Sequence, residues 1–171
     1  RVKMTIVQGK ISLDDRGCAY SPEFGDVYAS KDGAYEQSRF VFLGGNRLPE
    51  RWQGKAQFTI VENGFGLGTN FLTTLKAWRE DPKRSGKLFY LAIEGFPLQG
   101  TDIKTFASSA LRAEAEELAY KWPTVTPGVH RLTFDGGRVV LDLYFMPASA
   151  AAKKLPGAFD AFYPDGFSPK K

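Results

Sequence analysis

The chain has 171 residues, of which 43% are hydrophobic, and a formal net charge of +4. This length suffices for one domain with a sizeable core, and the sequence has neither an apolar run long enough to span a bilayer nor an N-terminal signal core. Cys18 and His130 are the only cysteine and the only histidine, which excludes an internal disulfide, argues against a zinc site and limits any Ser-His-Asp triad to His130. We therefore expect a cytoplasmic protein with no metal site and no membrane partner, whose mild basic excess is compatible with nucleic acid.

The N-terminal residues combine short apolar runs with turn residues. Met4–Val7 and Lys10–Leu13 have the character of short strands, and Arg39–Leu43 is a further apolar run that ends at two glycines. We predict that residues 1–50 form a β-rich cap or subdomain in front of a main domain at 51–171.

The main domain alternates strands and helices, which is typical of a Rossmann-like α/β fold. Its predicted elements are a strand at Phe58–Val61, a helix at Thr69–Trp78, a strand at Leu88–Ile93, an amphipathic helix at Asp102–Tyr120, a hairpin of Val129–Phe134 and Arg138–Phe145, a short helix at Ala148–Leu155 and a strand at Phe159–Tyr163. Because that last strand lies so close to the final residue, we expect an incomplete sheet and a domain truncated at its C-terminal side.

The stretch from Phe58 to Asn70 organises the main domain. An apolar, β-branched run leads into Glu62, three glycines follow at alternate positions (Gly64, Gly66 and Gly68), and a helical pattern begins at Thr69. Glycine lets the backbone turn tightly and approach a ligand, and the amides at the start of the next helix point into such a turn. Strand, glycine turn and helix together predict a nucleotide-binding unit.

Two cofactor classes compete for this turn. Nicotinamide dinucleotides use Gly-x-Gly-x-x-Gly, whereas this chain has Glu-x-Gly-x-Gly-x-Gly, which resembles the first motif of class I S-adenosylmethionine-dependent methyltransferases. Glu94, at the end of the second strand, is suited to accept hydrogen bonds from ribose hydroxyls in either class. An NAD(P)-dependent oxidoreductase therefore stays as an alternative, although the glycine spacing disfavours it.

A longer series of motifs resembles one family over nearly the whole chain, from about Ser21 to Lys171. The series includes Asp26-Val27-Tyr28, Arg39 to Asn46, Glu62 to Phe71, Glu94 to Leu98, His130 to Leu132 and Asp165 to Lys170. It is similar to the methyltransferase domain of the tRNA wobble-uridine modification enzymes of the MnmC/MnmD family.

The resemblance implies a fold, a reaction and a site. The reaction would move a methyl group from S-adenosyl-L-methionine to the amine of 5-aminomethyl(-2-thio)uridine at the wobble position, in the anticodon loop of tRNA. The two-domain relatives also carry a C-terminal FAD-dependent oxidase domain, which would lie outside this chain. The implied cofactor-binding residues are Glu62, Gly64, Phe65, Gly66, Gly68, Asn70 and Glu94.

Asp165 is the predicted catalytic residue. It follows a strand whose carboxyl end should face the cofactor crevice, and a carboxylate can orient an amine, help to remove its proton and stabilise positive charge that develops on nitrogen. Tyr28 and Phe167 are weaker candidates for stacking against a splayed-out wobble base. Asp165 could alternatively only cap a turn, and the whole chain could be a non-catalytic fragment that binds tRNA.

The sequence departs from the family after the strand that ends at Phe145. Met146-Pro147 stand where relatives commonly have Gly-Asp, so the acidic residue expected near the adenine is absent. The lysine pairs Lys153-Lys154 and Lys170-Lys171 are either phosphate contacts or ordinary solvated surface.

Overall fold

The structure is a computed structural model that describes residues 5–13, 19–21, 26–27 and 31–164. Its centre is a five-stranded sheet in the order β6-β7-β5-β4-β8. The strands are β4 (Gln57–Asn63), β5 (Lys87–Glu94), β6 (Gly128–Phe134), β7 (Val139–Phe145) and β8 (Ala161–Tyr163). All neighbours in this sheet are parallel except β6, which pairs antiparallel with β7.

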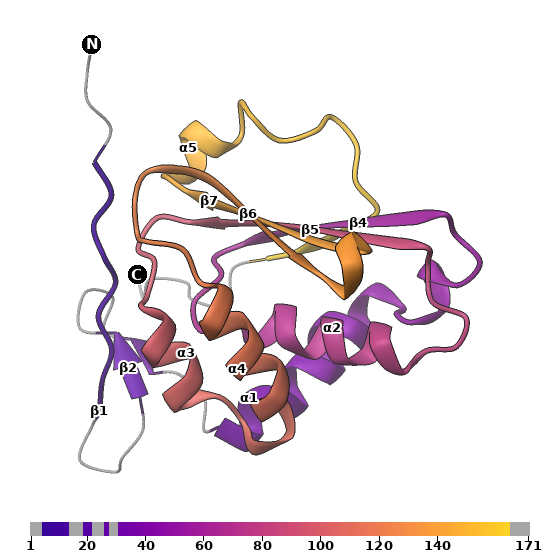
Figure 1. Ribbon diagram of the computed structural model, residues 1–171, viewed down its shortest axis with the longest axis horizontal. Coiled ribbons are helices and arrows are strands. Elements are labelled where there is room, and N and C mark those ends of the chain that lie inside the picture. Colours follow the sequence, from indigo (N-terminus) through magenta and orange to yellow (C-terminus); the bar gives the residue numbers. More distant parts are fainter. Residues whose placement is uncertain (1–4, 14–18, 22–25, 28–30, 165–171) are drawn as a thin grey trace.

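Helices cover the two faces of the sheet unequally (Figure 1). α1 (Lys31–Gln37), α2 (Thr69–Glu80), α3 (Gly100–Phe106) and α4 (Arg112–Lys121) lie on one side, and α5 (Ala148–Ala151) lies on the other. The larger apolar cluster lies on the four-helix side and includes Trp52, Phe71, Leu75 and Tyr90. A smaller cluster under α5 includes Val61, Leu91 and Met146. This arrangement confirms the predicted Rossmann-like α/β class.

The strand-turn-helix unit forms where the sequence predicts it. Phe58, Ile60 and Val61 are buried in β4, and Phe71, Leu72, Leu75 and Trp78 follow helical spacing on the buried side of α2. α2 stops before Asp81, whose extended backbone suits the residue preceding Pro82. The hairpin β6–β7 and the strands β5 and β8 also lie within the predicted ranges, to within a few residues.

One predicted helix is interrupted and another is shorter than expected. The predicted single helix over Asp102–Tyr120 is broken at Ala107 and Ser108, whose backbones are extended, and the Ser108 hydroxyl accepts from the Ala110 amide to start a 3₁₀ turn (Ser109–Leu111). α5 is also shorter than the predicted helix over Ala148–Leu155.

The expected β-rich character of residues 1–50 holds only for the first part of that segment. Three short antiparallel strands are present, β1 (Ser12–Leu13), β2 (Ala19–Ser21) and β3 (Asp26–Val27). From Lys31 onward the chain is helical: α1 continues into a π-helix (Ser38–Leu43), and 3₁₀ turns follow at Gly44–Asn46 and Glu50–Trp52. Ser38 and Leu43 are buried and Phe42 is partly buried; Phe42 and Leu43 follow Ser38 by four and five residues, which fits a helix and not a strand. Leu43 and Leu48 also join the main core, while the division at residue 50 stays a prediction.

None of the helices in the described part of the chain combines the length and the apolar composition needed to cross a membrane.

Candidate functional site

The glycine turn lies at the carboxyl edge of the sheet, where β4 ends. Gly64, Gly66 and Gly68 have φ values of 87°, 54° and 79°, a region that residues with a Cβ rarely adopt. The Gly64 amide donates to the Ile93 carbonyl at 2.8 Å, which joins the turn to the end of β5. The three glycines therefore meet a real conformational requirement.

Gly68 and Phe65 serve the packing of this turn. A Cβ on Gly68 would lie 2.9 Å from the Phe65 ring and 3.2 Å from Leu118 Cδ2. Phe65 is buried, and its ring stacks on Trp122 with centroids 5.5 Å apart. The side chain of Phe65 thus belongs to the core, and any contact of this residue with a cofactor would come from its backbone.

Glu94 is oriented towards the glycine turn by backbone amides. Its Oε1 accepts from the Gly66 amide at 2.8 Å, and its Oε2 accepts from the Phe96 amide at 3.0 Å. A carboxylate offers about four acceptor positions, so it can hold two amides and still accept from the hydroxyls of a ribose. Glu94 and Gly66 are both partly exposed, as a ligand-contacting pair must be.

The loop after Glu94 is fixed in turn by the N-terminal segment. The Gly9 amide donates to the Pro97 carbonyl at 2.8 Å, and Gly9 is buried. A Cβ on Gly9 would lie 2.3 Å from the Phe96 carbonyl oxygen, which only a backbone shift could relieve. The sequence analysis missed Gly9, because no local pattern signals a close approach between segments this far apart.

Glu62 lies beneath the glycine turn and is almost fully buried. Its Oε1 accepts from the Tyr90 hydroxyl at 2.9 Å and its Oε2 from the Asn70 side-chain amide at 2.7 Å. The Ser38 hydroxyl donates to Asn70 Oδ1 at 2.8 Å. These bonds connect the π-helix, α2, β4 and β5, and they give Glu62 and Asn70 a positioning role within the protein.

Two buried tyrosines accompany this network in their neutral form. Burial, followed by the charge of Glu62, raises the pKa of Tyr90 well above its usual value. Burial also raises the pKa of Tyr163, whose hydroxyl lies 3.0 Å from Thr74 Oγ1. Both hydroxyls therefore keep their protons at neutral pH, as the hydrogen bond from Tyr90 to Glu62 requires.

Three predicted site residues, Asp165, Tyr28 and Phe167, lie outside the described residues. β8 pairs in parallel with β4, and Glu62 stands opposite Tyr163. The carboxyl end of β8 therefore lies at the same edge of the sheet as the glycine turn, and Asp165 follows Tyr163 by two residues in the sequence.

The same edge includes the Met146-Pro147 segment. Met146 is buried, and its amide donates to the Glu94 carbonyl at 3.2 Å. Met146 and Pro147 offer an apolar contact and no side-chain acceptor, so an adenine near them would lack a carboxylate partner from these positions.

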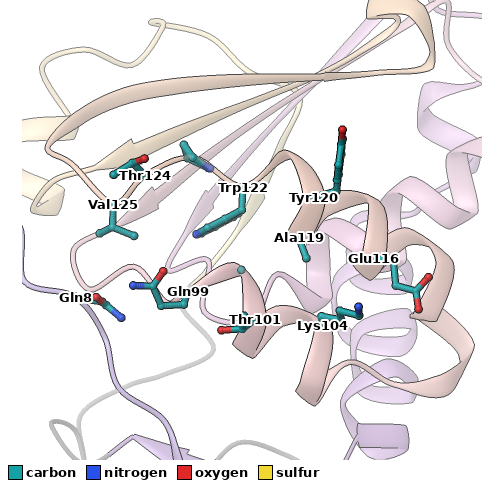
Figure 2. A pocket seen from close by; sticks show the side chains of 12 residues that line it. Gln8, Gln99, Thr101, Lys104, Glu116, Ala119, Tyr120, Trp122, Thr124 and Val125 are labelled. Atoms are coloured by element: carbon teal, nitrogen blue, oxygen red, sulfur yellow. The ribbon is translucent and has the colours of Figure 1, made fainter.

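A groove of about 740 Å³ lies between the N-terminal segment, the start of α3 and the end of α4. Figure 2 shows its lining, in which Gln8 and Gln99 lie close to one another and Trp122 lies between Gln99 and Tyr120. Trp122 donates through Nε1 to the Leu98 carbonyl and stacks on Phe65. The groove contains none of the predicted site residues. The candidate site is therefore identified by the sheet topology and the hydrogen bonds at the glycine turn, and not by this groove.

The residues present fit S-adenosyl-L-methionine. The turn supplies positive-φ glycines at the end of β4, and Glu94 supplies an acceptor for ribose hydroxyls at the end of β5. Open α/β sheets bind nucleotides at the carboxyl ends of their strands, which is where both features lie.

Comparison with known proteins points to the same chemistry. A sequence model of the family described as "S-adenosyl-L-methionine-dependent methyltransferase" matches residues 109–171. The chain is 46% identical over 171 residues to the "tRNA 5-methylaminomethyl-2-thiouridine biosynthesis bifunctional protein MnmC" of Burkholderia vietnamiensis, and 47% identical over 168 residues to that of Aromatoleum aromaticum. Each match covers 97% of this chain and 26% of the relative, so the chain spans about a quarter of the length of these relatives.

A solved structure supports the fold independently. The crystal structure of MnmC2 from Aquifex aeolicus matches with a TM-score of 0.67 at 24% identity, over 95% of this chain and 51% of that one. At this identity the likeness shows the fold alone. Together with the family model and the relatives, it shows that the chain matches the methyltransferase domain of MnmC proteins and has the Rossmann-like fold of S-adenosylmethionine-dependent methyltransferases.

Proposed function

We propose that this chain methylates the exocyclic amine of 5-aminomethyl(-2-thio)uridine at the wobble position of tRNA, in the cytoplasm. The observation that supports this most strongly is the arrangement at the carboxyl edge, where Gly66 and Phe96 amides hold the Glu94 carboxylate beside a positive-φ glycine turn. The names of the relatives supply the tRNA substrate and the modified base.

The chain's own residues account for binding and orientation. Glu94 would accept from the ribose of bound S-adenosyl-L-methionine, which supplies the methyl group, and Gly64 and Gly66 would let the backbone approach it closely. Glu62 and Asn70 would keep the turn in place through their buried hydrogen bonds. Most of the rate is expected to come from holding the amine in line with the methyl group.

Asp165 would act on the substrate amine. The amine must be neutral to attack, and a carboxylate next to it would orient it, accept its proton and stabilise the positive charge that develops on nitrogen. An FAD-dependent step belongs to this proposal only as the work of a second domain, which the bifunctional relatives suggest.

The test is methyl transfer from S-adenosyl-L-methionine to two tRNA preparations, one with aminomethyl and one with carboxymethylaminomethyl wobble uridine. We expect methylation of the first preparation only, because only its amine is primary and unblocked. Asp165→Asn should lower kcat by about 10²-fold or more while S-adenosylhomocysteine still binds. Full activity of this variant would contradict the role of Asp165, and tRNA binding without any methyl transfer by the unaltered protein would favour the non-catalytic alternative.

A further inference from the structure

The edge of the sheet opposite the glycine turn carries a concentration of positive charge. Five basic side chains come from the amino ends of the neighbouring strands β4, β5 and β7 and from the loops before them, and all five are exposed. We call them the basic edge: Lys55, Lys83, Arg84, Lys87 and Arg138. Their five positive charges exceed the net charge of +4 of the whole chain, so the rest of the sequence has a slightly negative net charge.

Backbone hydrogen bonds bring these loops together. The Gly54 amide donates to the Lys83 carbonyl at 3.3 Å, and the Gly86 amide donates to the Lys55 carbonyl at 3.0 Å. The Leu88 amide donates to the Arg138 carbonyl at 2.9 Å. The three loops therefore lie side by side at the amino edge of the sheet.

The carboxylates near the basic edge are already engaged with other groups. Asp81 is buried and accepts from Trp52 Nε1 at 2.8 Å, and Asp135 accepts from the Arg79 guanidinium at 2.6 Å. Within the described residues, no carboxylate lies at ion-pair distance from any of the five basic side chains. Asp135 feels the charges of Arg84 and Arg138, and Asp81 that of Lys83, but neither carboxylate forms an ion pair with them, so their outward faces can still contact an external anion.

Two of the arginines share a hollow of a size suited to an anionic group. Arg84 and Arg138 line a depression of about 390 Å³ with Trp78 and Ser85. The Arg84 guanidinium lies 5.1 Å from the centre of the Trp78 ring and donates to the Asp81 carbonyl at 3.3 Å. It is thus held in place before a ligand arrives, and a planar guanidinium pairs well with phosphate oxygens.

The position of the basic edge decides which part of an RNA it could contact. β4 runs from Gln57 at this edge to Asn63 at the glycine turn, a span of roughly 20 Å at about 3.3 Å per residue. If the wobble base lies at the glycine turn, the basic edge would therefore contact phosphates that lie well outside the anticodon loop.

We propose that the basic edge is a second tRNA-binding surface, which holds backbone phosphates of the tRNA body while the wobble base occupies the site at the opposite edge. This inference rests on the proposed tRNA substrate. Phosphate contacts of this kind add affinity and register without reading sequence.

The test compares two triple variants that remove the same charge from different surfaces. Lys55→Gln/Lys83→Gln/Lys87→Gln removes three charges from the basic edge, and the control Lys10→Gln/Lys104→Gln/Arg112→Gln removes three exposed basic side chains from elsewhere. Binding of full-length tRNA is measured over a salt series. We expect the basic-edge variant to lose about two units of slope in log K against log salt, at roughly 0.7–0.9 per phosphate contact, and the control to keep its slope.

Binding of a short anticodon stem-loop, which lacks the tRNA body, distinguishes the contribution of the basic edge from that of the methylation site. The basic-edge variant should bind the stem-loop as the unaltered protein does, and S-adenosylhomocysteine affinity should not change. An unchanged slope with full-length tRNA, or equal slopes in both triple variants, would overturn the proposal. Binding of inorganic phosphate to the hollow, abolished by Arg84→Gln/Arg138→Gln with no effect on tRNA, would assign the hollow to small anions and also overturn it. A slope change without any methyl transfer would leave this proposal standing and refute the proposed function.

Discussion

Glu94 combines two properties that are rarely found together in a structural carboxylate: partial exposure and two backbone amide donors, from Gly66 and Phe96. The amides fix the orientation of the carboxylate before any ligand binds. Its chemistry at the end of β5 is therefore that of an acceptor for hydroxyl groups, which is what the ribose of S-adenosyl-L-methionine presents.

Replacement of Glu94 by Gln is predicted to weaken cofactor binding. The neutral amide loses the charge-assisted hydrogen bonds, each worth about 1.5–3 kcal/mol, so S-adenosylhomocysteine affinity should fall by about tenfold or more. Calorimetric titration measures this directly, with Glu116→Gln as a control at an exposed position. Equal affinities in the two variants would remove Glu94 from the site.

Tyr90→Phe is predicted to destabilise the fold. The change removes the hydroxyl that donates to buried Glu62 at 2.9 Å, and a buried acceptor that loses a donor costs about 1–3 kcal/mol. Urea unfolding monitored by circular dichroism provides the free energy of unfolding. Tyr120→Phe, at a 91% exposed position, should change it by less than about 0.5 kcal/mol; if both variants lose the same amount, the buried network is not what Tyr90 supports.

At the scale of elements, the N-terminal segment and the loop after β5 form one unit. Gly9 approaches the Phe96 carbonyl so closely that no side chain fits between them, and the Phe96 amide holds Glu94. The N-terminal segment, nearly ninety residues away in the sequence, therefore affects the predicted ribose acceptor through a single intervening loop.

Gly9→Ala is predicted to raise the KM for S-adenosyl-L-methionine by about fivefold, since displacement of the loop weakens hydrogen bonds worth about 1 kcal/mol. The kcat at saturating cofactor should stay unchanged, because Gly9 packs on the loop that holds Glu94 and acts through the position of that loop. Steady-state kinetics separates the two parameters. Gly45→Ala is the matched control, as no atom lies within 4 Å of its added Cβ, and a fall in kcat alone would contradict the positioning role.

The elements that the sequence predicts well are those with strong local patterns. β4, the glycine turn and α2 follow from apolar spacing and three glycines, and the hairpin follows from Asp135-Gly136-Gly137 between two apolar runs. The helical segment after Lys31 was missed because it has few buried residues, and a short apolar run such as Arg39–Leu43 is compatible with either a strand or a helix. The break at Ser108 was missed because the apolar residues before and after it fit the pattern of one continuous helix.

The candidate site was only partly predictable for a different reason. Gly64, Gly66 and Glu94 stand at positions that their own strands define, so a local motif was enough to propose them as site residues. The positioning roles of Glu62 and Asn70 depend on Ser38 and Tyr90, which come from other elements. Only the folded chain brings such partners together.

At the scale of the whole molecule, an ion cluster ties α2 and α4 to the β6–β7 hairpin. Arg79 donates to Asp135 at 2.6 Å and to Glu117 at 3.0 Å. The hydrogen bond from Arg79 lowers the pKa of Asp135, and its positive charge adds to this. Because the pKa is lower in the folded protein, Asp135 stabilises the fold fully above its unfolded pKa of about 3.9, and this contribution is lost as the pH falls through the folded value.

Asp135→Asn should therefore cost about 1 kcal/mol of stability at pH 7, the upper range for a partly exposed ion pair, and should lessen the loss of stability below about pH 4. Urea unfolding over a pH series measures both effects. A variant that loses stability in parallel with the unaltered protein at every pH would show that Asp135 does not titrate with the fold.

The molecule as a whole presents two opposite edges with different chemistry. The carboxyl edge carries the glycine turn and Glu94, and the amino edge carries the five exposed cations of the basic edge. A tRNA bound to both edges would have its wobble base and its body held separately.

The most direct test of the account is a calorimetric titration of the protein with S-adenosylhomocysteine, with NADH as the control ligand. We predict that S-adenosylhomocysteine binds with one-to-one stoichiometry and that NADH does not bind. Binding of NADH alone would contradict the assignment of the carboxyl edge to S-adenosyl-L-methionine and would favour the oxidoreductase alternative.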